Sequence, residues 1–122
     1  GITPSLKLRA LCDAYGVRTA WHGPPDLTPI GHAVNVHLDI SSPNFGIQEW
    51  TDNDAVAGGT KALMEEMFPG MPECRQGYLY LNDKPGIGVD INEELAKKYE
   101  DAPRSSTKWM LTRLPDGTAV RP

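Results

Sequence analysis

Three polar side chains in the first half of the sequence could act together on one small molecule. His22 and Asp26 flank the rigid stretch Gly23-Pro24-Pro25, and Glu49 lies further along the chain. Consecutive prolines fix the backbone and lower the entropy lost in holding neighbouring side chains in place. An imidazole can donate or exchange a proton near neutral pH, and carboxylates accept hydrogen bonds from hydroxyl groups. The set suits a polyhydroxylated anion as its ligand.

The same three residues allow a second interpretation, which the sequence leaves open. In this interpretation His22 only caps a turn, and the carboxylates of Asp26 and Glu49 are solvated. Asp52 and Asp54 follow Glu49 closely and could suggest a cation site. Their spacing lacks the full pattern of a calcium-binding loop, so we interpret them as part of a solvated turn.

The two other histidines are weaker candidates for chemistry. His32 and His37 are five positions apart, a spacing that does not place them on one face of a helix and so disfavours a metal-binding pair. His37 falls on the apolar stripe expected for this segment, and we therefore predict that it is a core histidine. The sequence contains no phosphate-binding loop, nucleophile elbow or dinucleotide fingerprint.

Two helices are predicted in the first forty residues. Apolar residues at helical spacing predict the first over residues 4–15, with Thr3 as its N-cap, Pro4 as its first residue and Gly16 just past its end. Thr28-Pro29 repeats this start signal for the second helix. We expect the buried stripe of the second helix to consist of Ile30, Ala33, Val34, His37 and Leu38.

Two short strands are predicted to place His22 and Glu49 on the same face of a sheet. β-Branched and aromatic residues predict these strands over residues 17–21 and 45–50. Alternating strands and helices are typical of a parallel sheet, in which the loops that follow the strands share one face. In a (β/α)₈ barrel that face carries the active site. Because His22 and Glu49 each lie at or just past a strand end, we expect their side chains to converge.

The second half of the chain follows a less regular pattern. It predicts a short helix over residues 60–68, a strand over residues 78–81 and a helix over residues 93–99 that Asn92 caps. A barrel of this type needs about eight strands and roughly 250 residues, so two strands cannot close one. We therefore expect the 122 residues to be a piece of a longer chain.

The composition disfavours several classes of function. The formal net charge is −4 and the sequence pI is near 5.3, so the chain lacks the basic surface that binds nucleic acids or anionic membranes. Its apolar runs are far shorter than the roughly 20 residues of a membrane-spanning helix. Cys12 and Cys74 have no CxxC partner, and we interpret them as free thiols in a reducing compartment, which predicts a cytoplasmic protein.

Four sequence elements together resemble one known group of proteins. Residues 21–29 read Trp-His-Gly-Pro-Pro-Asp-Leu-Thr-Pro, and residues 43–49 read Pro-Asn-Phe-Gly-Ile-Gln-Glu. They resemble the seventh and eighth barrel strands of the mannonate dehydratase group of the enolase superfamily, which includes the starvation-sensing proteins. Phe68-Pro69-Gly70 and residues 81–91 resemble that group's return segment, so the resemblance covers nearly the whole chain.

The resemblance implies a Mg²⁺-dependent hydro-lyase that converts D-mannonate, or a related aldonate such as D-gluconate, to a 2-keto-3-deoxy sugar acid through an enediolate. It implies an α/β fold in which residues 1–50 form the last two strands and helices of a (β/α)₈ barrel. Residues 51–122 are implied to form a return segment that packs on a capping domain.

The resemblance also implies that His22, Asp26 and Glu49 bind the substrate, a small acid sugar. The Mg²⁺ ligands and the principal acid and base are expected upstream of Gly1, so we expect the chain alone to be inactive. The group's return segment suggests a homo-oligomer.

Two other functions stay open at this point. A non-catalytic or regulatory member, such as a starvation-sensing protein, would keep the fold and bind a sugar acid. Residues 114–122 lack the closing aromatic residue of efficient mannonate dehydratases, which disfavours high activity on mannonate. The third interpretation, a self-contained α/β binding module, would require the chain to cover the edges of its own two strands.

Overall fold

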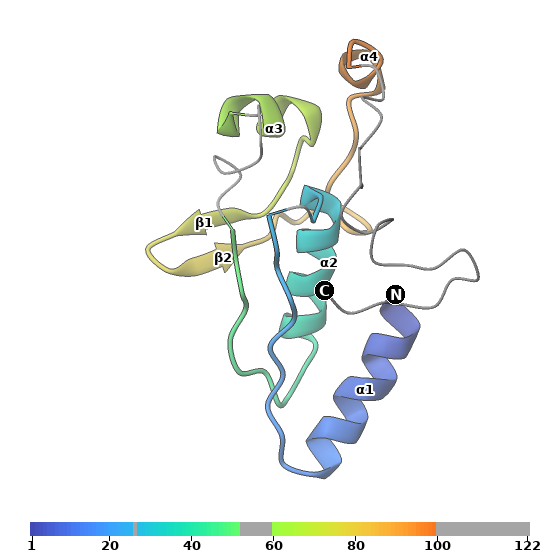
Figure 1. The fold of residues 1–122 in the computed structure, drawn as a ribbon, viewed down its shortest axis with the longest axis vertical. Helices are drawn as coiled ribbons and strands as arrows, with labels where there is room; N and C mark the ends of the chain where they lie inside the picture. Colours follow the sequence, from blue (N-terminus) through green and yellow to red (C-terminus); the bar gives the residue numbers. More distant parts are fainter. Residues whose placement is uncertain (26, 52–59, 100–122) are drawn as a thin grey trace, which may run out of the picture.

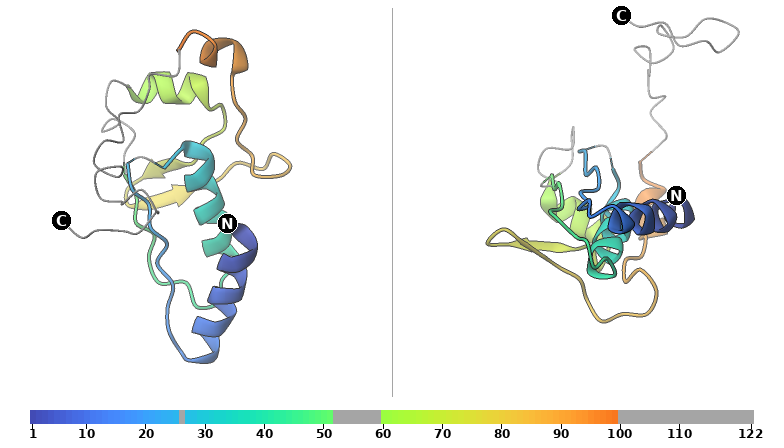
Figure 2. Two further views of the ribbon diagram at one scale, coloured as in Figure 1. Left: turned by 45° about the vertical axis from the view of Figure 1, so that its right-hand side comes forward. Right: turned by 90° about the horizontal axis from the view of Figure 1, so that it is seen from below.

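The computed structural model describes residues 1–25, 27–51 and 60–99 (Figure 1). Its elements in chain order are α1 (Ile2–Ala14), α2 (Pro29–Ile40), α3 (Lys61–Met67), β1 (Glu73–Arg75), β2 (Tyr78–Tyr80) and α4 (Glu93–Ala96). α1 packs against α2, and α3 contacts α4. The β1–β2 hairpin extends to one side of the helices (Figure 2). Within the described ranges, no helix is long and apolar enough to cross a membrane.

Helix α1 starts earlier than the sequence predicts. Gly1 is its N-cap, so Thr3 and Pro4 lie inside the first turn, and the prediction that Thr3 caps the helix is wrong. Proline is tolerated in the first turn because the N–H it lacks would have no partner in the helix. Gly16 follows the helix with a φ of 68°, which confirms the predicted end. No residue of α1 is buried, although Leu11 is a large apolar residue.

Helix α2 begins as predicted and buries Ala33 and Leu38 of the predicted stripe, whereas Ile30 and Val34 are half-buried. Thr28 is its N-cap and accepts a hydrogen bond from the Gly31 N–H at 3.3 Å. The prediction that His37 is a core residue is wrong, because His37 is exposed and its Nε2 lies 3.1 Å from the Ile87 carbonyl oxygen. His32 is the buried histidine. The buried residues of α2 are Pro29, His32, Ala33, Val36, Leu38 and Asp39.

The two strands predicted around the site are present as extended segments with one parallel bridge, between Thr19 and Phe45. The Thr19 N–H donates to the Asn44 carbonyl at 3.0 Å, and the Gly46 N–H donates to the Thr19 carbonyl at 2.9 Å. The parallel direction agrees with the prediction, but the regular strands over residues 17–21 and 45–50 do not form. Within the described residues each segment pairs on one side only, and a parallel ladder is stable when further strands flank it.

The second half of the chain contains one strand that the sequence did not predict. The predicted strand over residues 78–81 is β2, and it pairs antiparallel with β1 in the register Glu73↔Tyr80. Gln76 and Gly77 join the two strands, both with positive φ, which matches the two-residue turns that suit a hairpin's twist. Such a turn requires glycine, or a residue that tolerates a positive φ, at these positions.

The two predicted helices of the second half are both present. Thr60 caps α3, whose Met67 is buried. The Asn92 Oδ1 accepts a hydrogen bond from the Leu95 N–H at 3.1 Å, which confirms the predicted cap of α4. α4 ends at Ala96, three residues before the predicted end at residue 99.

The buried apolar core is small. It consists of Ala33, Val36, Leu38, Met67 and Leu95. Asp39 is buried beside this core with 7% of its surface exposed, and burial raises the pKa of its carboxyl group to about 6. The folded chain therefore holds a proton on Asp39 between about pH 4 and pH 6, where the unfolded chain has already lost it.

We predict that Asp39→Asn removes a pH-dependent loss of stability. In the parent chain the free energy of unfolding should fall as the pH rises from about 4 to 6, because the folded state binds the extra proton. Above pH 6 the variant should be more stable by about 1–3 kcal/mol. Urea unfolding followed by circular dichroism at pH 4.5 and 7.5 measures this. Asp13→Asn, on the exposed surface of α1, is the control, and an Asp39→Asn chain with the parent's pH dependence contradicts the prediction.

Candidate binding site at the ends of two parallel segments

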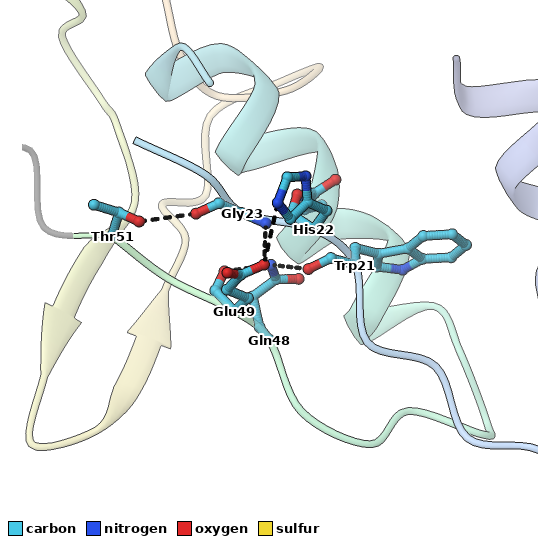
Figure 3. Close-up of polar contacts among 7 residues, drawn as sticks. Trp21, His22, Gly23, Gln48, Glu49 and Thr51 are labelled. Atoms are coloured by element: carbon cyan, nitrogen blue, oxygen red, sulfur yellow. Dashed lines mark hydrogen bonds and ion pairs between the residues drawn. The ribbon is translucent and has the colours of Figure 1, made fainter. Parts of the chain in front are cut away.

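The candidate site lies where the two extended segments leave their backbone pairing. Past the Thr19–Phe45 bridge, side chains take over the contacts between the segments (Figure 3). The Gln48 Nε2 donates to the Trp21 carbonyl at 3.0 Å, and the Thr51 Oγ1 donates to the Gly23 carbonyl at 3.0 Å. These bonds keep the segments parallel to the point where the candidate residues lie.

The two segments approach each other closely at Gly23 and Glu49. The Gly23 N–H donates to the Glu49 Oε2 at 3.0 Å, so the backbone of one segment holds the carboxylate of the other. A Cβ atom on Gly23 would lie 2.0 Å from the Glu49 carbonyl oxygen, a distance that the backbone cannot accommodate. Only glycine fits at this position.

His22 and Glu49 lie on the same side of the two segments, as Figure 3 shows. The His22 Nε2 is 3.8 Å from the Glu49 Oε2, and the two side chains are 78% and 55% exposed. The Asn35 Nδ2 of α2 donates to the His22 carbonyl at 3.0 Å, which anchors the backbone of this loop to the helix. The two candidate groups therefore meet at the surface, open to a ligand from solvent.

His32 lies beneath the site and contacts one of its two segments. It is 1% exposed, and its ring centroid is 4.7 Å from that of Trp50, the residue after Glu49. Burial lowers the pKa of His32, and the Pro24 carbonyl partly opposes this shift. The ring is therefore neutral at pH 7 and acts as a packing residue under the site.

The structure brings together two of the three predicted site residues. Asp26 lies outside the described residues, as do Asp52 and Asp54 of the predicted solvated turn. Sequence reasoning did not assign Gln48, Thr51 or Asn35 to the site. Gln48 lies inside the quoted motif Asn-Phe-Gly-Ile-Gln-Glu, which was the available signal for it, whereas nothing in the sequence pattern pointed to the other two.

The described residues contain no group of three or more His, Cys, Asp or Glu side chains that could hold a metal ion. His22 and Glu49 alone make an incomplete set of ligands. What the pair offers instead is one hydrogen-bond acceptor and one imidazole on an open surface. Such a pair can bind adjacent hydroxyl groups, or a hydroxyl and a carboxylate, of one small molecule.

Comparison with known families places the chain among enolase-like proteins. Residues 1–95 match the family described as "Enolase C-terminal domain-like". The chain is 57% identical over 122 residues to a D-galactonate dehydratase family member from Enterococcus gallinarum. It is 54% identical over 123 residues to the family member RspA from Pantoea ananatis. All of this chain is covered in both cases, but only 29% and 27% of the relatives.

Solved structures show the same relationship. An enolase from Pantoea ananatis, crystallised with bound D-gluconate and Mg, is 52% identical with a TM-score of 0.78, and the match covers 100% of this chain and 28% of that one. A putative L-alanine-DL-glutamate epimerase from Burkholderia xenovorans, bound to magnesium and fumarate, is 28% identical with a TM-score of 0.67. That match covers 80% of this chain and 22% of the epimerase. The chain thus spans less than a third of these relatives' length.

We predict that Gly23→Ala separates the two segments and costs about 3 kcal/mol of stability, the upper part of the range for overpacking, because the added Cβ meets backbone. The unfolding free energy from a urea titration measures this cost. Gly1→Ala is the control, since no atom lies within 4 Å of a Cβ built there. A Gly23→Ala chain as stable as the control would contradict the close approach described above.

Proposed function

We propose that this chain, which belongs to the enolase C-terminal domain-like family, contributes part of the substrate pocket of an acid-sugar dehydratase. The observation that carries this proposal is the meeting of His22 and Glu49, 3.8 Å apart, at the ends of two parallel segments. In enolase-like barrels the strand ends are where reacting molecules are bound. Asp26, four residues after His22, is proposed as the third binding residue.

The reaction sets the demands on these residues. Dehydration of an aldonate removes the C2 proton and the C3 hydroxyl as one molecule of water and leaves a 2-keto-3-deoxy acid. The C2 proton is weakly acidic, so the enediolate formed by its loss must be stabilised by positive charge and fixed dipoles. We assign His22 and Glu49 to binding and orienting the substrate: the carboxylate accepts hydrogen bonds from sugar hydroxyls, and the imidazole donates one to an oxygen.

The proposed metal is Mg²⁺, held by residues outside this sequence. The described residues do not fit a metal site, so no step of the reaction is assigned to a metal in this chain. The relative from Pantoea ananatis was crystallised with Mg and D-gluconate, which supports both the metal and the sugar-acid class. We propose D-gluconate or D-mannonate as the substrate.

We make three further proposals about the whole protein. Residues 1–50 would form the last two βα units of the barrel, and residues 51–122 the return segment toward a capping domain. The active protein would be a cytoplasmic homo-oligomer. Size-exclusion chromatography with light scattering measures the oligomeric state.

A second candidate function is binding of a sugar acid without turnover. It requires only that His22 and Glu49, which lie open to solvent, bind the hydroxyl groups of a sugar acid. Binding of D-gluconate without dehydration by the whole protein would support this regulatory function over the enzyme.

We predict that the 122-residue chain alone does not dehydrate D-mannonate or D-gluconate at any Mg²⁺ concentration, because the metal ligands and the acid and base would lie outside it. A colorimetric assay for the 2-keto-3-deoxy product measures this. Mg²⁺-dependent product formation by the chain alone contradicts the prediction.

We predict that His22 and Glu49 matter in a chimera in which this chain replaces the matching 28% of the Pantoea ananatis relative. Glu49→Gln and His22→Asn should each lower kcat/KM about 10²-fold, since each removes a charged or polar contact to the substrate worth roughly 1.5–3 kcal/mol. Steady-state kinetics with D-gluconate and D-mannonate measure the effect.

The chimera has matched controls within the same chain. His37→Asn changes an exposed histidine of α2, and Asp83→Asn changes an exposed carboxylate in the turn after β2. Both controls should keep kcat/KM within about twofold. If the site variants behave like these controls while the chimera remains active, His22 and Glu49 do not bind substrate.

A further inference from the structure

A second candidate site centres on Asp39, near the C-terminal end of α2. Its carboxylate oxygens are buried and have no hydrogen-bond partner among the described residues. Burying a charged group costs several kcal/mol unless a partner compensates it, so a lone buried carboxylate is rare. The three arginines of the described residues have other partners: Arg9 donates to the Ser41 carbonyl, the Arg18 Nε donates to the Phe45 carbonyl, and Arg75 pairs with Glu73.

Asp39 lines a cavity of about 430 Å³ between α2, residues 45–50 and the β1–β2 hairpin. The other walls are mostly apolar, and three of them are aromatic rings: Phe45, Trp50 and Tyr78. Besides Asp39, the titratable groups that line the cavity are Cys74 and Tyr78. The cavity thus combines one negative charge with apolar and aromatic walls.

This combination fits a cation that has an apolar stem. A guanidinium or ammonium group satisfies a buried carboxylate through a charge-assisted hydrogen bond and is attracted to the faces of aromatic rings. The methylene stem of such a side chain packs on apolar walls while its charged end reaches the carboxylate. A simple inorganic cation would leave the apolar walls without a partner.

We propose that the cavity at Asp39 binds an arginine or lysine side chain presented by a polypeptide segment from outside this chain. Charge complementarity with Asp39 selects a basic side chain. The chain spans less than a third of its relatives' length, so in those proteins polypeptide beyond the matching region is available to supply it. Gln48 and Trp50, which flank Glu49 in the sequence, line this cavity, but His22 and Glu49 do not. The proposal therefore does not depend on the proposed function.

The test uses the free thiol of Cys74, which lines the cavity, as a reporter, and that of Cys12 on α1 as an internal control. Saturating butylguanidinium, and the peptide acetyl-Gly-Arg-Gly-amide, should slow alkylation of Cys74 by iodoacetamide at least about fivefold and leave Cys12 unchanged. 1-Pentanol, which has the apolar stem without the charge, should protect poorly.

The variant Asp39→Asn should weaken binding of both cationic probes about tenfold or more, the effect of losing one charge-assisted hydrogen bond. Asp39→Glu, which keeps the charge, should retain part of the affinity and guards against a folding defect in the first variant. Far-UV circular dichroism checks that each variant keeps the parent's helices.

Four results would overturn the proposal. Equal binding of butylguanidinium to the parent and Asp39→Asn would show that the carboxylate does not select the ligand. Equal protection by 1-pentanol would make the cavity a plain apolar pocket. Protection by butylguanidinium but not by the peptide would assign the cavity to a small free cation, and no protection by either would exclude a cation site.

Discussion

The parallel pairing of two extended segments is the constraint on which the site depends. Thr19 and Phe45 form its one backbone bridge, and beyond that bridge Gln48 and Thr51 continue the pairing with side-chain hydrogen bonds. Glu49 is held in the same way, because its carboxylate accepts the Gly23 N–H. His22 and Glu49 are 27 residues apart in the sequence, yet they meet because both segments run in one direction. If the register shifted by one residue, the two side chains would point to opposite faces.

Helix α2 supports both segments from beneath, through polar as well as apolar contacts. Asn35 fixes the carbonyl of His22, and His32 packs its neutral ring on Trp50. The same helix buries Asp39 beside a cavity that its apolar neighbours do not fill. Helix α2 therefore anchors the His22 loop through Asn35 and, one turn later, lines the cavity with Asp39. The helix that contributes Ala33, Val36 and Leu38 to the core thus also contacts the His22 loop at the surface.

The sequence predicted most features that depend on local chemistry, with the Thr3 cap as an exception. The Thr28 and Asn92 caps were predicted correctly because a capping side chain bonds to an amide two or three residues away. The regular strands over residues 17–21 and 45–50 were predicted wrongly. A strand forms only when neighbouring strands supply its hydrogen bonds, and the local sequence does not show whether such strands are present. β1 was missed since its pairing depends on the turn at Gln76-Gly77. His37 was wrongly predicted to be a core residue because helical spacing alone does not determine which face of α2 meets the rest of the fold.

The sequence correctly predicted that the side chains of His22 and Glu49 lie close together, because this follows from the ends and the common direction of the two segments. The role of these two residues in substrate binding stays a prediction. The most direct test of that role is a crystal structure of the chimera with D-gluconate. We expect the side chains of His22 and Glu49 both to lie within hydrogen-bond distance of the same D-gluconate molecule. A ligand that contacts neither residue, or only one of them, would contradict it.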